Sequence, residues 1–190
     1  MDELGRSPLA HRLQDLARIE VATGGDVVVE HVPFLAQVDL RLAPELVPRA
    51  PYPVPLTPNT AWEDGPRAAL WLGPNEWLIL GPPGSQVQIA EELERALDGT
   101  HRSIIDVSDN RVALELSGSA AKDVLARGCS LDLDARSWSV GSCAQTLLAR
   151  AQVILHERAE TTGILVRPSF ADYLLDWLLD ATARPVSTAT

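Results

Sequence analysis

The chain has 190 residues, of which 46% are hydrophobic and 22% charged, and its formal net charge is −10. A chain of this length and composition can bury one sizeable core, or two small subdomains that share one, and it is not typical of a disordered protein. Its 16 basic residues are 15 arginines and a single lysine, Lys122, and this acidic balance argues against binding to nucleic-acid phosphates or to an anionic membrane surface.

The location of the protein is predicted from what the sequence lacks. No hydrophobic run reaches the roughly 18 to 20 residues of a membrane-spanning helix. The N-terminal stretch MDELGRSPLAHRL contains acidic residues and no hydrophobic signal-peptide core. Two cysteines, Cys129 and Cys143, form neither a disulfide framework nor a zinc ligand set. We therefore expect a cytoplasmic protein with reduced thiols.

Residues 1–20 are predicted to form an N-terminal segment with a short helix from His11 to Ile19. Its hydrophobic residues have helical spacing and so share one face: Leu9, Leu13, Leu16 and Ile19. We expect this face to contact a partner protein. After Gly24-Gly25, strands are predicted from Val27 and over 35–42.

Residues 44–66 contain seven prolines and are predicted to form a long extended loop. Proline has no N–H group and a fixed φ, which excludes a central strand or a helix. A loop of this length either contacts a partner or lies over the core of its own chain, and the sequence favours neither.

Two blocks of 29 residues share one predicted pattern, residues 69–97 and 153–181. Each has a strand, a turn, a strand, a short polar break and an amphipathic helix. Ser85 and Ser169 are the predicted N-caps of the two helices, and Ile89, Leu93 and Leu97 are expected to face inward in the first. The repeated pattern indicates a structural duplication.

Between these blocks, the stretch IIDVSDNRVALELSGSAAKDVL (104–125) predicts a strand, a polar turn, a half-buried strand and a helix. Ser119 is the expected N-cap of this helix and Gly128 its left-handed end. We predict an α+β fold in which 21–181 form one globular unit of two subdomains, about 21–100 and 101–181. Each has antiparallel strands with helices on one side, and residues 182–190 form a flexible tail.

The residues offer little sign of catalysis. No phosphate-binding glycine loop, zinc-protease motif or nucleophile elbow occurs. The four histidines lie in separate elements, and Cys129 and Cys143 are expected to be small core residues. Asp106, Ser108 and Asp109 suit a hydrogen-bonded turn better than a ligand site. The five tryptophans are expected mostly in the core, with one or two available to a protein interface.

Several stretches resemble a known family. DVSDNRVALELSGSAAKDVL is similar to a pattern of the folate-binding, aminomethyltransferase-like fold. LARGCSLDLDARSW, CAQTLLARAQVIL and GILVRPSFADYLLDWLLDA, together with SPLAHR and LGPNEWLIL, resemble the gamma subunit of heterotetrameric sarcosine oxidase. The resemblance extends from about Ser7 to Ala181.

This resemblance implies a cytoplasmic complex that oxidatively demethylates sarcosine to glycine, forming methylenetetrahydrofolate and hydrogen peroxide. The partners would be the alpha, beta and delta subunits, which would carry FAD, FMN, NAD, tetrahydrofolate and zinc. The chain lacks the paired acidic residues after a glycine pair by which active aminomethyltransferases recognise folate. We therefore assign it no catalytic, cofactor-binding or metal-binding residue.

Three alternatives remain open at this point. The chain could be a free-standing folate-binding protein that resembles aminomethyltransferases. It could be the same subunit in a complex that acts on another N-methyl amino acid. It could also be a stand-alone structural or adaptor protein.

Overall fold

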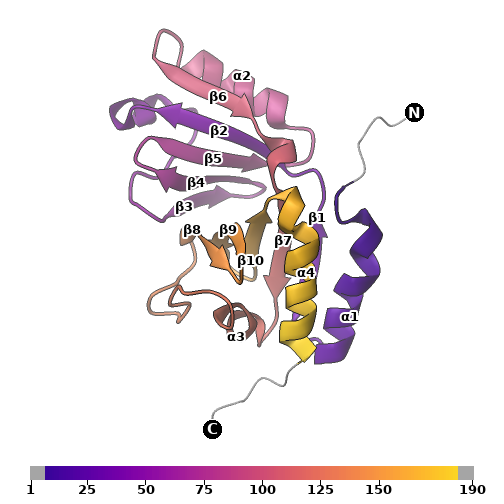
Figure 1. The fold of residues 1–190 in the computed structure, drawn as a ribbon. Helices are drawn as coiled ribbons and strands as arrows, with labels where there is room; N and C mark the ends of the chain where they lie inside the picture. The colour runs from indigo at the N-terminus through magenta and orange to yellow at the C-terminus, as the bar shows by residue number, and fades with distance from the viewer. Residues whose placement is uncertain (1–6, 184–190) are drawn as a thin grey trace, which may run out of the picture.

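The structure, a computed structural model, describes residues 7–183, which fold into two five-stranded antiparallel sheets with helices outside them (Figure 1). Sheet A contains, in spatial order, β1 (Val28–Val32), β7 (Val112–Ser117), β10 (Thr162–Val166), β9 (Ala151–Glu157) and β8 (Cys143–Leu148). Sheet B contains, in spatial order, β3 (Ala61–Asp64), β4 (Arg67–Gly73), β5 (Glu76–Gly81), β2 (Ala36–Leu42) and β6 (Arg102–Asp106). The helices are α1 (Leu13–Thr23), α2 (Gln86–Ala96), α3 (Ala121–Ala126) and α4 (Pro168–Ala183), with short 3-10 turns η1 (Ala10–Arg12), η2 (Pro44–Arg49) and η3 (Ser108–Asn110).

The layers follow from the alternation of side chains along each strand. One face of sheet A packs against α1, α3 and α4, and one face of sheet B packs against α2. The other faces of the two sheets pack on each other in a third hydrophobic cluster. The predicted α+β class with helices on one side of each sheet is confirmed. None of the helices within residues 7–183 is long and apolar enough to cross a bilayer.

The two sheets have the same strand order when the halves of the chain are compared. From edge to edge, β6-β2-β5-β4-β3 corresponds to β1-β7-β10-β9-β8. In each half, a hairpin leads into a helix, β4–β5 into α2 and β9–β10 into α4. This common order supports the predicted duplication.

Each half contributes its first strand to the sheet of the other half. β1 pairs with β7 in sheet A, although β2 to β5 lie in sheet B. β6 pairs with β2 in sheet B, although β7 to β10 lie in sheet A. A division near residue 100 therefore separates the sequence repeats but not the sheets. Hydrophobic periodicity reports which face of a strand is buried and carries no information on its pairing partner, so it could not reveal the exchange.

The chain passes between the sheets at two adjacent places, after β1 and after β6. Phe34, in the first crossover, has φ 57°, a conformation uncommon for a bulky side chain. Gln37, which is 1% exposed, joins the two crossovers. Its side-chain amide donates to the carbonyl oxygens of Ser108 (3.3 Å) and Arg111 (2.8 Å), and its backbone N–H donates to Ser108 Oγ (3.0 Å).

The N-terminal segment packs on its own chain. α1 lies beside α4 in Figure 1, and Leu9, Leu16 and Ile19 are buried in the core of sheet A. Arg12 joins the two helices through ion pairs with Asp172 (3.2 Å) and Asp176 (2.6 Å). Most of the apolar face from which we predicted a partner contact is therefore covered within the chain, because a short helix can pack on its own sheet as well as on a partner; Leu13 of this face is 52% exposed. Residues 1–6 lie outside the described part of the chain.

The proline-rich segment lies over the core of sheet B. It begins with η2, continues through extended chain and ends in the edge strand β3. Val47 and Val54 are buried beside α2, and Trp77 Nε1 donates to the carbonyl oxygen of Pro55 at 2.7 Å. Of the two roles left open by the sequence, packing over its own core is the one seen. The prediction of no helix was wrong for η2, because proline is tolerated at the start of a helical turn.

Several predicted helix ends were wrong. Ser85 occupies the N-cap position of α2 as predicted, but its hydroxyl forms no capping hydrogen bond and donates to the carbonyl oxygen of Pro82 at 2.7 Å. The N-cap position of α3 is Ala120 and not Ser119, whose hydroxyl donates to Asp26 Oδ1 at 2.7 Å. Ser169 lies inside α4, which begins at Pro168. α4 continues to Ala183, past the predicted start of the tail, and residues 184–190 are outside the described range.

Gly128 does not have the predicted left-handed conformation; it is needed because Trp177 packs against it, 2.5 Å from where a Cβ would lie. A left-handed glycine is instead required at Gly118, in the loop after β7. Gly118 has φ 105°, and an added Cβ would lie 2.3 Å from the carbonyl oxygen of Asp26, which accepts a hydrogen bond from the Ala120 N–H at 3.0 Å. The contact holds the end of β7 against the residues that lead into β1.

Gly118→Ala is therefore expected to lower the free energy of unfolding by about 3 kcal/mol, since backbone strain and a steric clash with a fixed backbone atom add. Gly99→Ala is the matched control: its φ is 72° and no atom lies within 4 Å of the added Cβ, so the expected loss is only about 1 kcal/mol. Urea unfolding of both variants tests this difference. Equal losses would show that the Gly118 contact does not matter.

Candidate functional site

The layer between the two sheets buries a face of β7 that the prediction of a half-buried strand left open to solvent. Ala113 on this face is 5% exposed, because sheet B covers this face of sheet A. The strand register arranges the inner face of sheet A in rows across β7, β10, β9 and β8. The central row contains Ala113, Leu165 and Ile154, all buried. Charged residues lie at both ends of this hydrophobic layer.

At one end, Arg158 is neutralised by two carboxylates. It pairs with Glu63 of β3 and with Glu115 of β7, so it joins the two sheets. His156 of β9 is 4% exposed, and its Nε2 lies 3.6 Å from Glu63 Oε2 with no hydrogen-bond partner among the described residues. Burial lowers the pKa of His156 to about 4, and Glu63 opposes this only in part. The imidazole is therefore neutral at pH 7.

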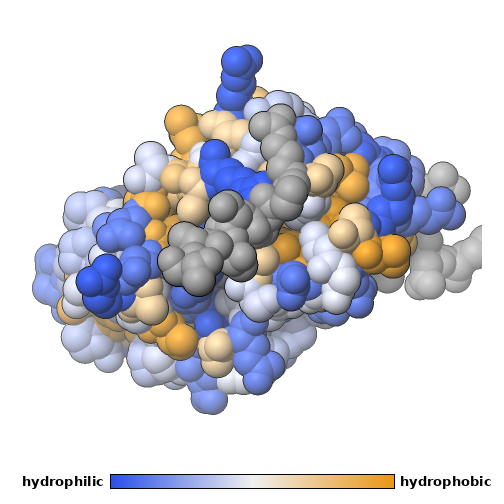
Figure 2. All heavy atoms as spheres, turned by 90° about the horizontal axis from the view of Figure 1, so that it is seen from below, coloured by the Kyte–Doolittle hydropathy of each residue, from blue (hydrophilic) through white to orange (hydrophobic). Residues whose placement is uncertain are grey.

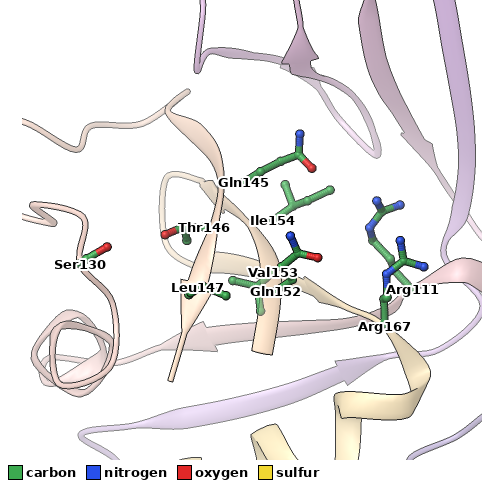
Figure 3. A pocket seen from close by; sticks show the side chains of 9 residues that line it. All are labelled: Arg111, Ser130, Gln145, Thr146, Leu147, Gln152, Val153, Ile154 and Arg167. Carbon is green, nitrogen blue, oxygen red and sulfur yellow. The ribbon is translucent and has the colours of Figure 1, made fainter. Parts of the chain in front are cut away.

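At the opposite end, the layer opens into a groove of about 400 Å³, which we call the arginine groove. Figure 3 shows the nine residues that line it: Arg111, Ser130, Gln145, Thr146, Leu147, Gln152, Val153, Ile154 and Arg167. Gln145 Nε2 donates to the carbonyl oxygen of Leu72 at 3.0 Å, which ties β8 to the end of β4. The guanidinium groups of Arg111 and Arg167 lie side by side at one end of the groove (Figure 3).

The two arginines face each other because of the strand register. Val112 of β7 pairs with Val166 of β10, which places Arg111 opposite Arg167 one step further. Arg167 Nη1 donates to Asn110 Oδ1 at 3.1 Å. Among residues 7–183, no carboxylate forms an ion pair with either guanidinium. Burial, assisted by the charge of Arg167, lowers the pKa of Arg111. Two like charges directly opposite each other destabilise a sheet.

Asp106, Ser108 and Asp109 lie in the crossover that positions Arg111. Asp106 Oδ1 accepts hydrogen bonds from the backbone N–H (3.0 Å) and hydroxyl (2.6 Å) of Ser108. The predicted turn-forming role of Asp106 and Ser108 is confirmed. Asp109 lines a second cavity, of about 500 Å³, together with His31 and Phe34.

The cysteines and histidines remain apart. Cys143 begins β8 and Cys129 bridges to Leu148 at its other end, so the two thiols are not neighbours; both are buried and free. Burial raises the pKa of Cys143 to about 11, which disfavours the thiolate. His31 hydrogen-bonds Ser7 and His11 pairs with Asp172, each away from His156. Among residues 7–183, no three potential ligands gather to hold a metal ion.

A buried carboxylate that the sequence did not single out has a structural role. Glu157 is 6% exposed and accepts hydrogen bonds from Trp138 Nε1 (3.0 Å) and Thr162 Oγ1 (2.8 Å). It also pairs with Lys122 Nζ at 2.7 Å. These partners compensate the burial of the charge.

The arginine groove is the feature that sequence reasoning missed. Arg111 lies directly before β7 and Arg167 directly after β10, far apart in the sequence. Only the pairing of β7 with β10 brings them together. Guanidinium, amide and hydroxyl groups in a concave surface can bind an anion, and the guanidinium fork matches a carboxylate especially well.

Comparisons with known proteins agree over nearly the whole chain. Residues 49–184 match the model of the sarcosine oxidase, gamma subunit family. A sarcosine oxidase subunit gamma from Arthrobacter sp is 36% identical over 186 residues, covering 94% of this chain and 90% of that protein. The subunit gamma from Corynebacterium sp. (strain U-96) is 32% identical over 190 residues, covering 96% and 92%.

Two solved structures are also similar. A chain of the heterotetrameric sarcosine oxidase from Corynebacterium sp. U-96, in complex with pyrrole 2-carboxylate, superimposes with a TM-score of 0.84 at 30% identity, covering 98% of this chain and 100% of that one. The glycine cleavage system aminomethyltransferase T from Bartonella henselae has a TM-score of 0.64 at 16% identity, covering 87% and 48%. The second similarity concerns the fold alone.

The burial of neutral His156 predicts a loss of stability in acid. Below the unfolded-state pKa of about 6.5, the unfolded chain takes up a proton that the folded chain, with its pKa about 4, does not. This one group should lower the free energy of unfolding by about 2 kcal/mol between pH 7 and pH 5. In His156→Gln, the free energy of unfolding measured with urea should fall between pH 7 and pH 5 by about 2 kcal/mol less than in the wild type. The control His101→Gln, at an exposed position, should follow the wild type. Identical pH dependence in all three proteins would contradict the prediction.

Proposed function

The chain belongs to the sarcosine oxidase gamma subunit family, and we propose that it serves as the non-catalytic gamma subunit of a heterotetrameric sarcosine oxidase. The observation that carries this proposal is the similarity over almost the full length of both chains to a chain of the solved heterotetramer. The alpha, beta and delta subunits are its proposed partners. In this complex, the chain supports assembly.

The proposed reaction of the complex is the oxidative demethylation of sarcosine to glycine, with formation of methylenetetrahydrofolate and hydrogen peroxide. The FAD, FMN, NAD, tetrahydrofolate and zinc of the complex belong, in this proposal, to the other subunits. The side chains of this chain support that division. Cys143 is buried with a raised pKa, His156 is buried beside an ion-paired carboxylate, and Glu157 is fully engaged with its neighbours. The free cysteines suit a cytoplasmic location.

Folate binding by the isolated chain is the main rival function, because the fold also occurs in an aminomethyltransferase. The sequence speaks against it, because the chain lacks the paired acidic residues after a glycine pair that the resemblance to active aminomethyltransferases implies for folate recognition. On the face shown in Figure 2, exposed hydrophobic residues are interspersed with hydrophilic ones.

Co-expression with alpha, beta and delta subunits of a heterotetrameric sarcosine oxidase tests the proposal. The chain, affinity-tagged, should co-purify with flavin-containing subunits in equimolar amounts, and the purified complex should oxidise sarcosine. The chain alone should show no sarcosine oxidase activity. Failure to recover a flavoprotein with the tagged chain would contradict the proposed function.

Calorimetric titration of the isolated chain with tetrahydrofolate distinguishes the rival. We expect no saturable binding in the micromolar range. Saturable binding that is lost on substitution of a residue lining the arginine groove would favour a folate-binding protein instead.

A further inference from the structure

The two charged ends of the layer between the sheets differ in one respect. At the His156 end, a single guanidinium is matched by two carboxylates, those of Glu63 and Glu115. In the arginine groove, two guanidinium groups lie opposite each other and no carboxylate of residues 7–183 pairs with them. The first end is therefore paired by direct contacts within the chain. At the second, the carboxylates of Asp39 and Glu76 act on Arg111 only from a distance, and they do not outweigh burial and the charge of Arg167, which together lower the pKa of Arg111.

The uncompensated pair is held in place by the fold. Arg111 follows the crossover whose backbone is fixed by Gln37, and its own carbonyl oxygen accepts a hydrogen bond of 2.8 Å from the Gln37 amide. Arg167 connects β10 directly to α4 and is tethered to Asn110 at 3.1 Å. Neither backbone can move away from the other without disturbing β7 or β10. The repulsion between the two cations is therefore retained in the isolated chain.

We propose that the arginine groove receives the carboxylate of an acidic side chain from a partner subunit, which pairs with Arg111 and Arg167. This inference rests on the proposed function, because the partner is another subunit of the complex. A carboxylate between two guanidinium groups removes their repulsion and accepts charge-assisted hydrogen bonds from both. The pair is a local positive site on a chain of net charge −10, and it attracts a partner carboxylate to this groove.

The surroundings of the groove fit a protein occupant. Leu147, on the edge strand β8, is 51% exposed at the rim of the groove, where an apolar contact can flank the ion pairs. Gln145 and Gln152 extend along the same face (Figure 3) and provide amide groups for backbone or side-chain hydrogen bonds. Arginine with flanking apolar and amide groups is typical of protein interfaces.

Substitution of both arginines tests the proposal in two measurements, association with the other subunits and the melting temperature of the isolated chain. If the arginines had a purely structural role, both quantities would fall together. Arg111→Gln with Arg167→Gln should weaken association with the other subunits about 10- to 100-fold and reduce the dependence of association on salt. The melting temperature of the isolated double variant should equal or exceed that of the wild type, because the repulsion is gone. Arg136→Gln, at an exposed site in another loop, is the matched control and should change neither measurement.

Cross-linking identifies the occupant. The chain has one lysine, Lys122, which is ion-paired with Glu157 within the chain, so the background of amine coupling is low. In the complex assembled with Arg167→Lys, a water-soluble carbodiimide should join the new amine to the carboxylate that faces it, and mass spectrometry should place that carboxylate in another subunit. The wild-type complex treated in the same way is the control.

The outcomes separate the inference from the function on which it rests. If the wild-type chain does not assemble with the other subunits, both are wrong. If it assembles and the double variant assembles equally well, or if Arg167→Lys gives no cross-link to another subunit, only the inference is wrong. Micromolar binding of citrate to the isolated wild-type chain, with unchanged assembly of the double variant, would also overturn it and assign the groove to a small anion.

Discussion

The structure depends on the exchange of edge strands between the two repeats. β1 completes the sheet of the second repeat and β6 that of the first, so neither five-stranded sheet is complete with the strands of one repeat alone. The exchange requires the chain to cross twice between the sheets, and Gln37 holds both crossovers together through hydrogen bonds to Ser108 and Arg111. These hydrogen bonds compensate the burial of the Gln37 N–H groups, although its side-chain oxygen has no partner among the described residues, and losing them would leave further buried polar groups unpaired. The crossover that builds the fold therefore also fixes Arg111.

The layer between the sheets shows how a fold without a catalytic constellation can still carry specific chemistry. Its centre is hydrophobic, and the register of four antiparallel strands brings charged residues to both ends. At one end, the Glu63–Arg158–Glu115 group joins the sheets and leaves a buried neutral histidine beside it. At the other, Arg111 and Arg167 repel each other in a groove open to solvent. Burying charges costs desolvation energy at both ends of the layer. Only at the Arg158 end do ion pairs within the chain offset this cost.

The sequence predicted the local elements well and their partners poorly. Hairpins at β4–β5 and β9–β10, and the inward face of α2 with Ile89, Leu93 and Leu97, follow from periodicity, because burial of one face is a local property. The exchange of β1 and β6 does not follow from periodicity, since strand pairing depends on the whole fold. Neither the Ser85 nor the Ser119 hydroxyl accepts a hydrogen bond from a helix N–H; each is oriented by donating to a nearby oxygen, which the sequence pattern does not reveal. The proximity of Arg111 and Arg167 could be predicted only if the register of β7 and β10 were known.

An uncompensated cation pair in a subunit links folding to assembly. Whatever neutralises Arg111 and Arg167 binds the folded chain and not the unfolded one, because the register that opposes them exists only in the folded sheet. Binding of this kind raises the free energy of unfolding with the concentration of the binding partner. The isolated subunit is then less stable than the same subunit in its complex, and an excess of unassembled chain unfolds more readily. The crossovers that Gln37 joins thus have two roles. They let the exchanged edge strands complete both sheets, and they present a charge that the chain leaves unpaired.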